Sequence, residues 1–437
     1  MRAEISPARR AAFRILRDIA GKQGNSDTLL HSRSVDALSA PDRNLCTNMV
    51  MGTLRWQRVL DSQCRHLFSR PNQPLADDAM LALRVGAYQL LLLDRIPAHA
   101  AIFESVEWIK QSDAARQAGL VNAVLRKVAA LPKPFRADAK LAYPEWMVAR
   151  WEKIYGRDAC RNICEAGQKE PQTAFRILAK DVEAADSKSL QPGAFLSNAR
   201  VAQTAIAEIP AGTQIQDEGS QLVAELLGCG SQILDCCAAP GGKTAIIASN
   251  NPNAQILACD IQPARLETMR RRMKTILPEA RIDYRAIDAA KLGNIGPFDR
   301  ILCDVPCSGT GTLSRNPEIR HRIQLEDLSR HAARQEKILK AALRLLAPGG
   351  RLLYATCSLE PEENERVVAG VLNSAGDSDR LRQVGLQEEF DRLREQEIVQ
   401  GKEVAHLRRT AFRDGFLRTI PGIHCCDGFF AAMIERE

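Results

Sequence analysis

Apolar side chains recur three or four positions apart along the first 130 residues, which is the spacing of an amphipathic helix. The stretch 6–21 begins with Ser6 and Pro7, residue types that favour the start of a helix. The same spacing returns in four further stretches, at 42–68, 76–93, 97–112 and 119–131. Because no strand-like alternation interrupts them, we predict an all-α domain over residues 1–132.

The helical spacing breaks at the proline-containing stretch LPKPF, residues 131–135, which indicates a linker. Residues 140–215 then combine two helical stretches with one short strand-like run, TAFRIL, and turn-rich sequence. Because so little apolar sequence cannot bury a large core, we predict a small α/β subdomain over 140–215.

From residue 216 onward, short apolar runs alternate with amphipathic helical stretches. The runs lie at 231–237, 254–260, 281–288, 298–307 and 350–358. This alternation is typical of a mostly parallel, doubly wound sheet with helices on both faces. We therefore predict a multidomain chain that ends in a Rossmann-like α/β domain over 216–437. Such folds bind ligands at the carboxyl ends of their strands.

Composition narrows the class of protein. The 437 residues are 45% hydrophobic and 26% charged, as in ordinary globular proteins. No run approaches the roughly 20 apolar residues that cross a membrane. The basic N-terminus is not followed by the apolar core of a secretory signal. We expect a cytoplasmic protein without a membrane partner.

The formal net charge of +7 is concentrated at the front of the chain. Residues 1–150 hold 22 Lys and Arg against 14 Asp and Glu, so the rest of the chain is close to neutral. A basic front end indicates contact with a polyanion, most plausibly a nucleic acid. A basic surface that serves solubility alone remains the alternative.

The chain has 13 cysteines, an odd number, and none forms a Cys-x-x-Cys pair. A disulfide framework and a typical zinc site are therefore not expected, and we predict no metal. Cys160 and Cys164 lie one helical turn apart, which helix packing explains better than half of a metal site. Most of the cysteines are predicted to pack as small apolar residues.

The stretch DCCAAPGGKT, residues 235–244, joins the first predicted strand to a helix. Its end resembles a triphosphate-binding loop, but Cys237 stands where that loop has its first glycine, which argues against a nucleotide hydrolase. Gly241 and Gly242 allow a ligand to approach the backbone, and the helix start favours an anion. A ligand that combines an adenosine with an amino-acid carboxylate suits this loop.

Aspartates follow the next two predicted strands. Asp260 lies eighteen residues after Gly242, where an acidic residue can accept both hydroxyl hydrogens of a ribose. Asp288 ends the following strand and is expected near an adenine. Either aspartate alone is equally well explained as a helix cap.

Two cysteines follow the last two parallel strands of the prediction. The stretch DVPCSGTGT brings together Asp304, Pro306 and Cys307, and YATCSLEPEENE contains Cys357. A buried structural cysteine explains either one alone. Because the carboxyl ends of parallel strands share one edge, we expect the two cysteines to lie close together, as at a reactive site.

These stretches together resemble the motifs of S-adenosylmethionine-dependent RNA (cytosine-5) methyltransferases, as do QDEGSQL before them and the closing DGFF. The helical front end, with RNLCTNMVMGTLRW, is similar to the NusB-like RNA-binding domain. That domain accompanies the RsmB (Sun/Fmu) branch of bacterial ribosomal RNA methyltransferases. The resemblance covers nearly the whole chain, and its catalytic motifs are more specific than the helical part.

The resemblance implies roles for individual residues. Cys357 would attack C6 of cytosine, and Cys307 would assist loss of the C5 proton and release of the enzyme. Asp304 would hydrogen-bond the base at N3 and the exocyclic amine, with Lys243 beside the reacting groups. S-adenosylmethionine, the expected cofactor, would be held by Cys237, Ala238, Ala239, Pro240, Gly241, Gly242, Lys243, Asp260, Asp288 and Asp304.

The implied substrate is small-subunit (16S) ribosomal RNA, methylated by a monomer. Transfer RNA remains an alternative, as does a non-catalytic RNA-binding or assembly protein. An amino-group methyltransferase is disfavoured because Asp-Val-Pro-Cys replaces its Asn/Asp-Pro-Pro-aromatic motif. The basic stretch RNPEIRHR, residues 315–322, is predicted to contact phosphate or substrate. Val305 and the pair Cys425–Cys426 depart from the family pattern.

Overall fold

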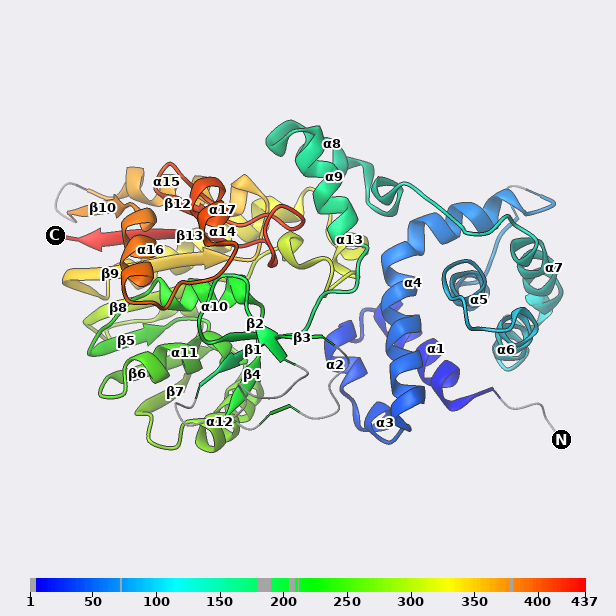
Figure 1. Cartoon of the computed structure of the whole chain (residues 1–437), viewed down its shortest axis with the longest axis horizontal. Coiled ribbons are helices and arrows are strands. Elements are labelled where there is room, and N and C mark those ends of the chain that lie inside the picture. The colour runs from blue at the N-terminus through cyan, green and yellow to red at the C-terminus, as the bar shows by residue number, and fades with distance from the viewer. Residues whose placement is uncertain (1–4, 71–72, 179–189, 204–208, 211, 377–379) are drawn as a thin grey trace. The chain divides into compact units, whose positions relative to one another are not determined.

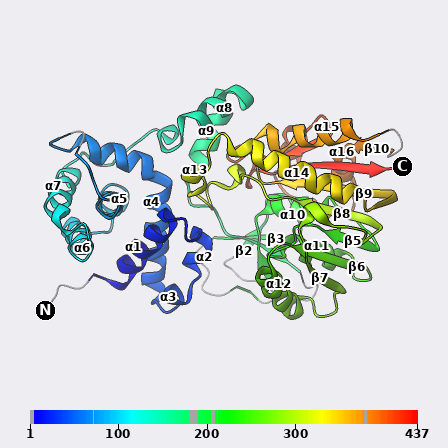
Figure 2. The ribbon, with the colours of Figure 1, turned by 180° about the vertical axis from the view of Figure 1, so that it is seen from behind.

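The computed structural model describes residues 5–70, 73–178, 190–203, 209–210, 212–376 and 380–437. The chain divides into two compact units, whose elements can be followed in Figures 1 and 2. The helical unit consists of Met1–Glu170 together with Leu313–Arg322. The sheet unit consists of Pro171–Thr312 and Ile323–Glu437.

The predicted all-α front end is confirmed. The helices of this unit are α1 (Pro7–Ala20), α2 (Ser26–Leu30), α3 (Arg33–Asp36), α4 (Ala40–His66), α5 (Asp77–Leu92), α6 (Ala98–Lys110), α7 (Ala118–Ala129), α8 (Glu145–Tyr155) and α9 (Arg157–Ala166). Helix α5 is the core helix, because its side chains are buried on almost every side. It lies so close to α4 that a Cβ on Gly52 would come within 1.9 Å of the Tyr88 ring.

Helices α8 and α9 lie in the helical unit, although the sequence predicts them in a small α/β subdomain. The strands of that predicted subdomain lie in the sheet unit instead. They are β1 (Ala174–Ile177), β2 (Leu190–Pro192), β3 (Ala199–Ala202) and β4 (Thr213–Ile215). They pair in the order β2-β3-β1-β4, all antiparallel. The boundaries 1–132, 140–215 and 216–437 stay predictions.

The stretch 315–322 is predicted to contact phosphate or substrate, and for Arg320 this prediction is wrong, because its side chain is buried in the helical unit. Arg320, in the short helix α13 (Ile319–Arg322), is only 1% exposed. Its guanidinium donates to the carbonyls of Gly167 and Leu313 at 3.1 Å and lies 4.1 Å from the ring centre of Tyr143. A guanidinium enclosed in this way cannot contact RNA phosphate.

Glu318 is buried beside Arg320 and accepts hydrogen bonds from the backbone amide and hydroxyl of Ser26 at 2.9 Å. His321 contacts the Leu54 carbonyl at 2.8 Å, and burial lowers its pKa to about 4. The segment Leu313–Arg322 is therefore a structural part of the helical unit. It is separated in sequence from the rest of that unit by more than 140 residues.

The large sheet of the sheet unit has a parallel centre. Its strands are β5 (Gln232–Asp235), β6 (Gln255–Asp260), β7 (Ile282–Ala286), β8 (Phe298–Asp304), β9 (Leu346–Thr356), β10 (Leu381–Val384), β11 (Phe412–Arg413), β12 (Phe416–Arg418) and β13 (Phe430–Arg436). Strands β5 to β9 are joined by parallel pairings in the order β7-β6-β5-β8-β9. The strand order reverses at β5, the kind of point where such sheets bind ligands. The Rossmann-like prediction is confirmed.

The antiparallel strands, which the sequence analysis did not predict, extend one side of this sheet. β13 pairs antiparallel with β9, and β10 and β12 pair antiparallel with β13. The sequence contains no signal for this reversal, because a buried antiparallel strand such as AAMIE reads like any short apolar run.

Helices cover both faces of the large sheet (Figures 1 and 2). On one face α10 (Glu218–Glu225), α11 (Gly242–Asn250), α12 (Pro263–Ile276) and α16 (Leu386–Glu395) form one core layer. On the other face α14 (Asp327–Leu343) and α15 (Glu365–Ser374) form the second. Alternate strand residues enter the two layers, as with Ile233 and Leu234 of β5.

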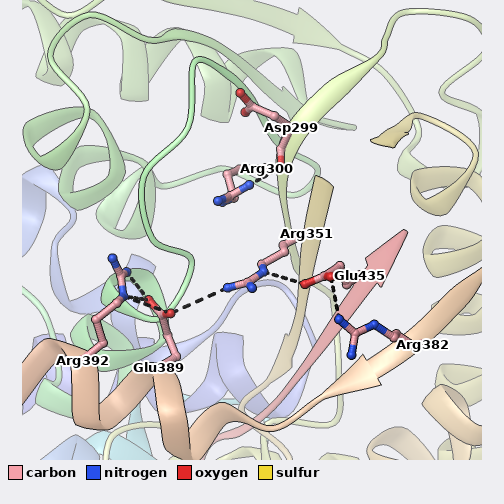
Figure 3. A network of polar contacts seen from close by, with 7 residues as sticks. All are labelled: Asp299, Arg300, Arg351, Arg382, Glu389, Arg392 and Glu435. Carbon is pink, nitrogen blue, oxygen red and sulfur yellow. Dashed lines mark hydrogen bonds and ion pairs between the residues drawn. The ribbon is translucent and has the colours of Figure 1, made fainter. Parts of the chain in front are cut away.

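A network of charged side chains lies near the amino ends of β8 and β9, away from their carboxyl ends (Figure 3). Arg351 of β9 contacts Glu435 at 2.9 Å and Glu389 at 3.9 Å, and Arg382 contacts Glu435 at 2.8 Å. Because the arginines are substantially exposed, each pair contributes no more than about 1 kcal/mol. This edge of the sheet holds an exposed ion-pair network, and the predicted site residues lie at the other edge.

Candidate active site

The loop between β5 and α11 has the conformation that its glycines permit. Gly241 has a φ of 98°, in the left-handed region, and precedes the first residue of α11. A Cβ on Gly241 would lie 2.7 Å from the side chains of Met269 and Met273. The Ala238 amide donates to the Cys259 carbonyl at 2.7 Å, so the loop is fixed to the end of β6. The start of α11 is thus held beside the carboxyl ends of the strands.

Asp235, the last residue of β5, was not predicted as part of the site. Its side chain is buried and accepts a hydrogen bond from the Thr244 hydroxyl at 2.7 Å. Burial raises the pKa of this carboxyl to about 7. The signal in the sequence was an acidic residue at the end of a predicted strand, directly before the two cysteines of the loop.

The two predicted cofactor aspartates lie at the ends of neighbouring strands. Asp260 ends β6, is 5% exposed, and accepts from the Gln262 amide at 2.9 Å. Asp288 follows β7 and caps a short 3-10 helix through the Ala290 amide at 3.1 Å. One oxygen of Asp288 therefore does cap a helix, as the alternative explanation expects. The other oxygen is not used in that cap.

Lys243 and Asp304 form an ion pair between the loop and the end of β8. The ammonium nitrogen lies 2.7 Å from Oδ2 of Asp304 and 5.2 Å from the ring centre of Phe429. Burial lowers the pKa of Lys243, but the charge and hydrogen bond of Asp304 outweigh this effect, so its pKa lies above the usual value. The side chain consequently carries its positive charge at neutral pH.

The two predicted reactive cysteines come together, with 3.3 Å between the sulfur atoms of Cys307 and Cys357. Both are partly exposed. The hydrogen bond with Cys357, burial and the nearby charge of Glu363 raise the pKa of Cys307 well above its usual value. Cys357, by contrast, lies close enough to Lys243 for its charge to contribute to the raised pKa of that lysine. A charged side chain therefore lies near each sulfur atom, Glu363 near Cys307 and Lys243 near Cys357.

The donor set along this edge suits the predicted cofactor. Carboxylates end or follow three successive strands, and the partly buried start of the nine-residue helix α11 lies beside them. Carboxylates bind ribose hydroxyls and the amines of adenine and an amino acid, while a helix start binds a carboxylate. Within the described residues, no group of three or more His, Cys, Asp or Glu is arranged to hold a metal.

Comparison with known proteins decides the family. The chain is 30% identical to the ribosomal RNA small subunit methyltransferase B of Xanthomonas campestris pv. campestris, over 99% of each chain. It is also 30% identical to the probable methyltransferase of the same name from Bacillus subtilis, over 98% of each chain. The model of the family described as 16S rRNA methyltransferase RsmB/F matches residues 228–435. The chain belongs to the RsmB/F family.

The front of this RsmB/F chain matches the NusB family over residues 6–130, in agreement with the predicted resemblance. Among solved structures, PH0851 is similar over 100% of both chains, with a TM-score of 0.77 and 22% identity, which shows a shared fold. A methyltransferase homolog protein from Pyrococcus horikoshii covers 69% of this chain, at a TM-score of 0.54 and 25% identity. In the described part of the chain, every helix is too short or too polar to cross a membrane.

Proposed function

We propose that this RsmB/F chain transfers a methyl group to C5 of a cytosine in small-subunit (16S) ribosomal RNA, as a monomer, through a covalent bond between Cys357 and C6. The observation that carries the proposal is the pair of sulfur atoms 3.3 Å apart at neighbouring strand ends, beside the Lys243–Asp304 ion pair. The names of its relatives support the choice of RNA.

S-adenosylmethionine, when bound, supplies a methyl group on a positively charged sulfur. The backbone of Cys237, Ala238, Ala239, Pro240, Gly241 and Gly242 would hold its amino-acid end near the start of α11. Asp260 would bind the ribose hydroxyls, and Asp288 and Asp304 would bind its amines. The solved structure of NSun6 from Pyrococcus horikoshii with SFG is similar to this chain in fold, at a TM-score of 0.54.

Cys357 is the better nucleophile of the two cysteines because of its neighbours. Lys243 lies near Cys357 with a positive charge that would face the negative charge of the attacking sulfur, and a thiol at Cys307 can donate a hydrogen bond to that sulfur. The thiol of Cys357 loses its proton to solvent, and its sulfur forms a bond to C6. The electron pair of the C5=C6 double bond moves to C5, which becomes able to attack an electrophilic methyl group.

Cys307 and Asp304 act on the base. Asp304 would accept a hydrogen bond from the exocyclic amine and share a proton with N3, which stabilises the charge that develops as C6 is attacked. After C5 has gained the methyl group, Cys307 gives its own thiol proton to solvent and its sulfur takes the proton from C5. The electrons of that C–H bond re-form the C5=C6 double bond, and the bond between Cys357 and C6 breaks.

The target cytosine must be unstacked, because the sulfur attacks C6 from above the plane of the ring. The basic residues of the front end would bind the RNA backbone around it. The positive charge that the sequence places in residues 1–150 serves this role in the proposal.

The test incubates the full chain with 16S ribosomal RNA and radiolabelled S-adenosylmethionine and resolves the products on a denaturing gel. C307A is expected to accumulate a protein–RNA adduct, because release is blocked, and C357A is expected neither to methylate nor to form the adduct. C229A, which removes an exposed cysteine outside the site, is the matched control and should behave as wild type. Methylation of cytosine by C357A would contradict the nucleophile, and transfer only to transfer RNA would contradict the substrate.

A further inference from the structure

The buried carboxylate of Glu363 contacts the residues that follow the two cysteines and has no part in the chemistry described above. Glu363, at the end of the 3-10 helix Pro361–Glu363, is 0% exposed. A buried carboxylate costs several kcal/mol in desolvation unless its oxygens are hydrogen-bonded. Within the described residues its partners are hydroxyl and amide groups, so no cation compensates the charge there.

Four donors fill the four acceptor positions of this carboxylate. Oε1 accepts from the backbone amide of Ser308 at 2.8 Å and from Nε2 of Gln335 at 3.0 Å. Oε2 accepts from the hydroxyl of Ser358 at 2.5 Å and from the hydroxyl of Ser308. Ser308 and Ser358 are the residues directly after Cys307 and Cys357.

The same carboxylate therefore holds two loops that are 50 residues apart in the sequence. The hydroxyls of Ser308 and Ser358 are 2.9 Å apart, and Gln335 also donates to the carbonyl of Pro306 at 3.0 Å. Asn364, the next residue along, accepts from the Thr356 hydroxyl at 2.6 Å and donates to the Ser358 carbonyl at 2.9 Å. Both sides of each cysteine are thus fixed by side-chain hydrogen bonds.

We propose that Glu363 is a positioning residue that sets the spacing of the Cys307 and Cys357 sulfur atoms. The role of this spacing in methyl transfer rests on the proposed function. The spacing itself does not, because it can be measured without RNA. Bonds to a charged acceptor are the strong ones, and a site of this kind must be held within about 0.5 Å.

Glu363 also acts on Cys307 through its charge, which is among the causes of the raised pKa of that cysteine. The four hydrogen bonds that Glu363 accepts from Ser308, Gln335 and Ser358 form a clamp. Replacing the carboxylate with an amide removes the charge and also weakens this clamp. The two effects change measurable rates in opposite directions. Cys307 should react faster with an alkylating reagent, because more of it is thiolate, while formation of a disulfide with Cys357 should slow, because the two sulfur atoms are no longer held together.

The experiment uses the full chain as E363Q, S308A and the double variant, with E362Q as the matched control. Glu362 is the preceding residue and forms an exposed ion pair with Arg366. Diamide serves as the oxidant for disulfide formation, and iodoacetamide alkylates Cys307 in a C357S background. Methyl transfer to 16S ribosomal RNA gives kcat and KM, and binding of S-adenosylmethionine gives a Kd.

In E363Q we expect disulfide formation to slow and kcat to fall, each by roughly tenfold or more, while KM and Kd stay within about twofold. Alkylation of Cys307 should be faster in the same variant. S308A, which keeps the charge and removes one hydroxyl, should show smaller losses and no faster alkylation. The double variant should be no worse than E363Q, because both changes act on the same clamp.

A wild-type rate of disulfide formation in E363Q, or a wild-type kcat, would overturn the proposal. Equal losses in E362Q would do the same, because they would reflect a general disturbance of the segment. If E363Q does not fold, S308A carries the test, and an unchanged disulfide rate there counts against the clamp. If the wild-type chain methylates no RNA, the proposed function fails, while the disulfide and alkylation rates still test the spacing.

Discussion

Two pairs of cysteine sulfur atoms lie almost equally close in the sheet unit. The sulfur atoms of Cys307 and Cys357 are 3.3 Å apart, in the loops that follow β8 and β9. Those of Cys236, directly after β5, and Cys303, within β8, are 3.5 Å apart. Cys236 and Cys303 are buried in an apolar core layer with residues such as Leu234 and Ile301. Cys307 and Cys357 are partly exposed, with Lys243 and Glu363 near them.

The comparison shows that proximity of two sulfur atoms does not make either of them reactive. A thiolate needs a positive charge or a strong donor close to it and a path for the substrate. The hydrogen bond with Cys303 and burial raise the pKa of Cys236 well above its usual value, which keeps it a thiol. Only the pair at the strand ends combines access with charged neighbours, so the two pairs should respond differently to substitution.

The largest expected difference concerns the charge beside the exposed pair. In K243M the ammonium near Cys357 is lost, and Asp304 loses its partner at 2.7 Å. We expect kcat/KM for methyl transfer to fall by roughly 10²-fold, with slower alkylation of Cys357 at pH 7. K274M, on the exposed side of α12, is the control and should keep wild-type rates. An unchanged alkylation rate in K243M would contradict the electrostatic role.

The next effect concerns Asp235, which adjoins the buried pair and has a pKa raised to about 7 by burial. A carboxyl whose pKa is higher in the folded than in the unfolded protein binds more protons when folded. Wild-type stability should therefore fall, relative to D235N, as the pH rises from about 4 to about 7. We expect a change of about 2–4 kcal/mol between pH 4 and pH 8, measured by urea denaturation. D283N, which changes an exposed aspartate, serves as control. A difference in the free energy of unfolding between wild type and D235N that stays constant across this pH range would contradict the prediction.

The smallest effect concerns the buried pair itself. C303A removes one buried sulfur atom from an apolar layer, which should lower the free energy of unfolding by about 1–2 kcal/mol. Methyl transfer should stay within about twofold of wild type, because neither charge nor access at the strand ends changes. Urea denaturation and initial rates on the same sample check both parts. A loss of activity comparable to that of C357A would remove the distinction between the pairs.

The parts of the molecule that could be predicted from the sequence are those in which the reactive residues and the residues that set the local backbone lie together in one short stretch. The glycine loop before α11 was found because Gly241 and Gly242 must stand together between a strand and a helix. The proximity of Cys307 and Cys357 followed from the rule that parallel strands end at one edge. The positions of Asp260 and Asp288 followed from the same rule.

Glu363 and Arg320 could not be predicted because their partners are distant in the sequence. Glu363 lies in an acidic stretch that looks like a solvated turn, and its partners on Ser308 and Gln335 come from other elements. Arg320 stands in a basic stretch that suggests phosphate contact, and its partner Gly167 lies 153 residues earlier. Composition describes charge but does not tell whether that charge is buried.

The buried segment Leu313–Arg322 also has a consequence for the order in which the protein is made. On the ribosome, residues 1–170 emerge first. The hydrogen bond between Ser26 and Glu318, and that between Gly167 and Arg320, can form only after the later residue of each pair has been translated. At about 5–20 residues per second, the missing segment follows roughly seven to thirty seconds later. The first unit to emerge is thus the one that cannot be completed until nearly three-quarters of the chain has been translated.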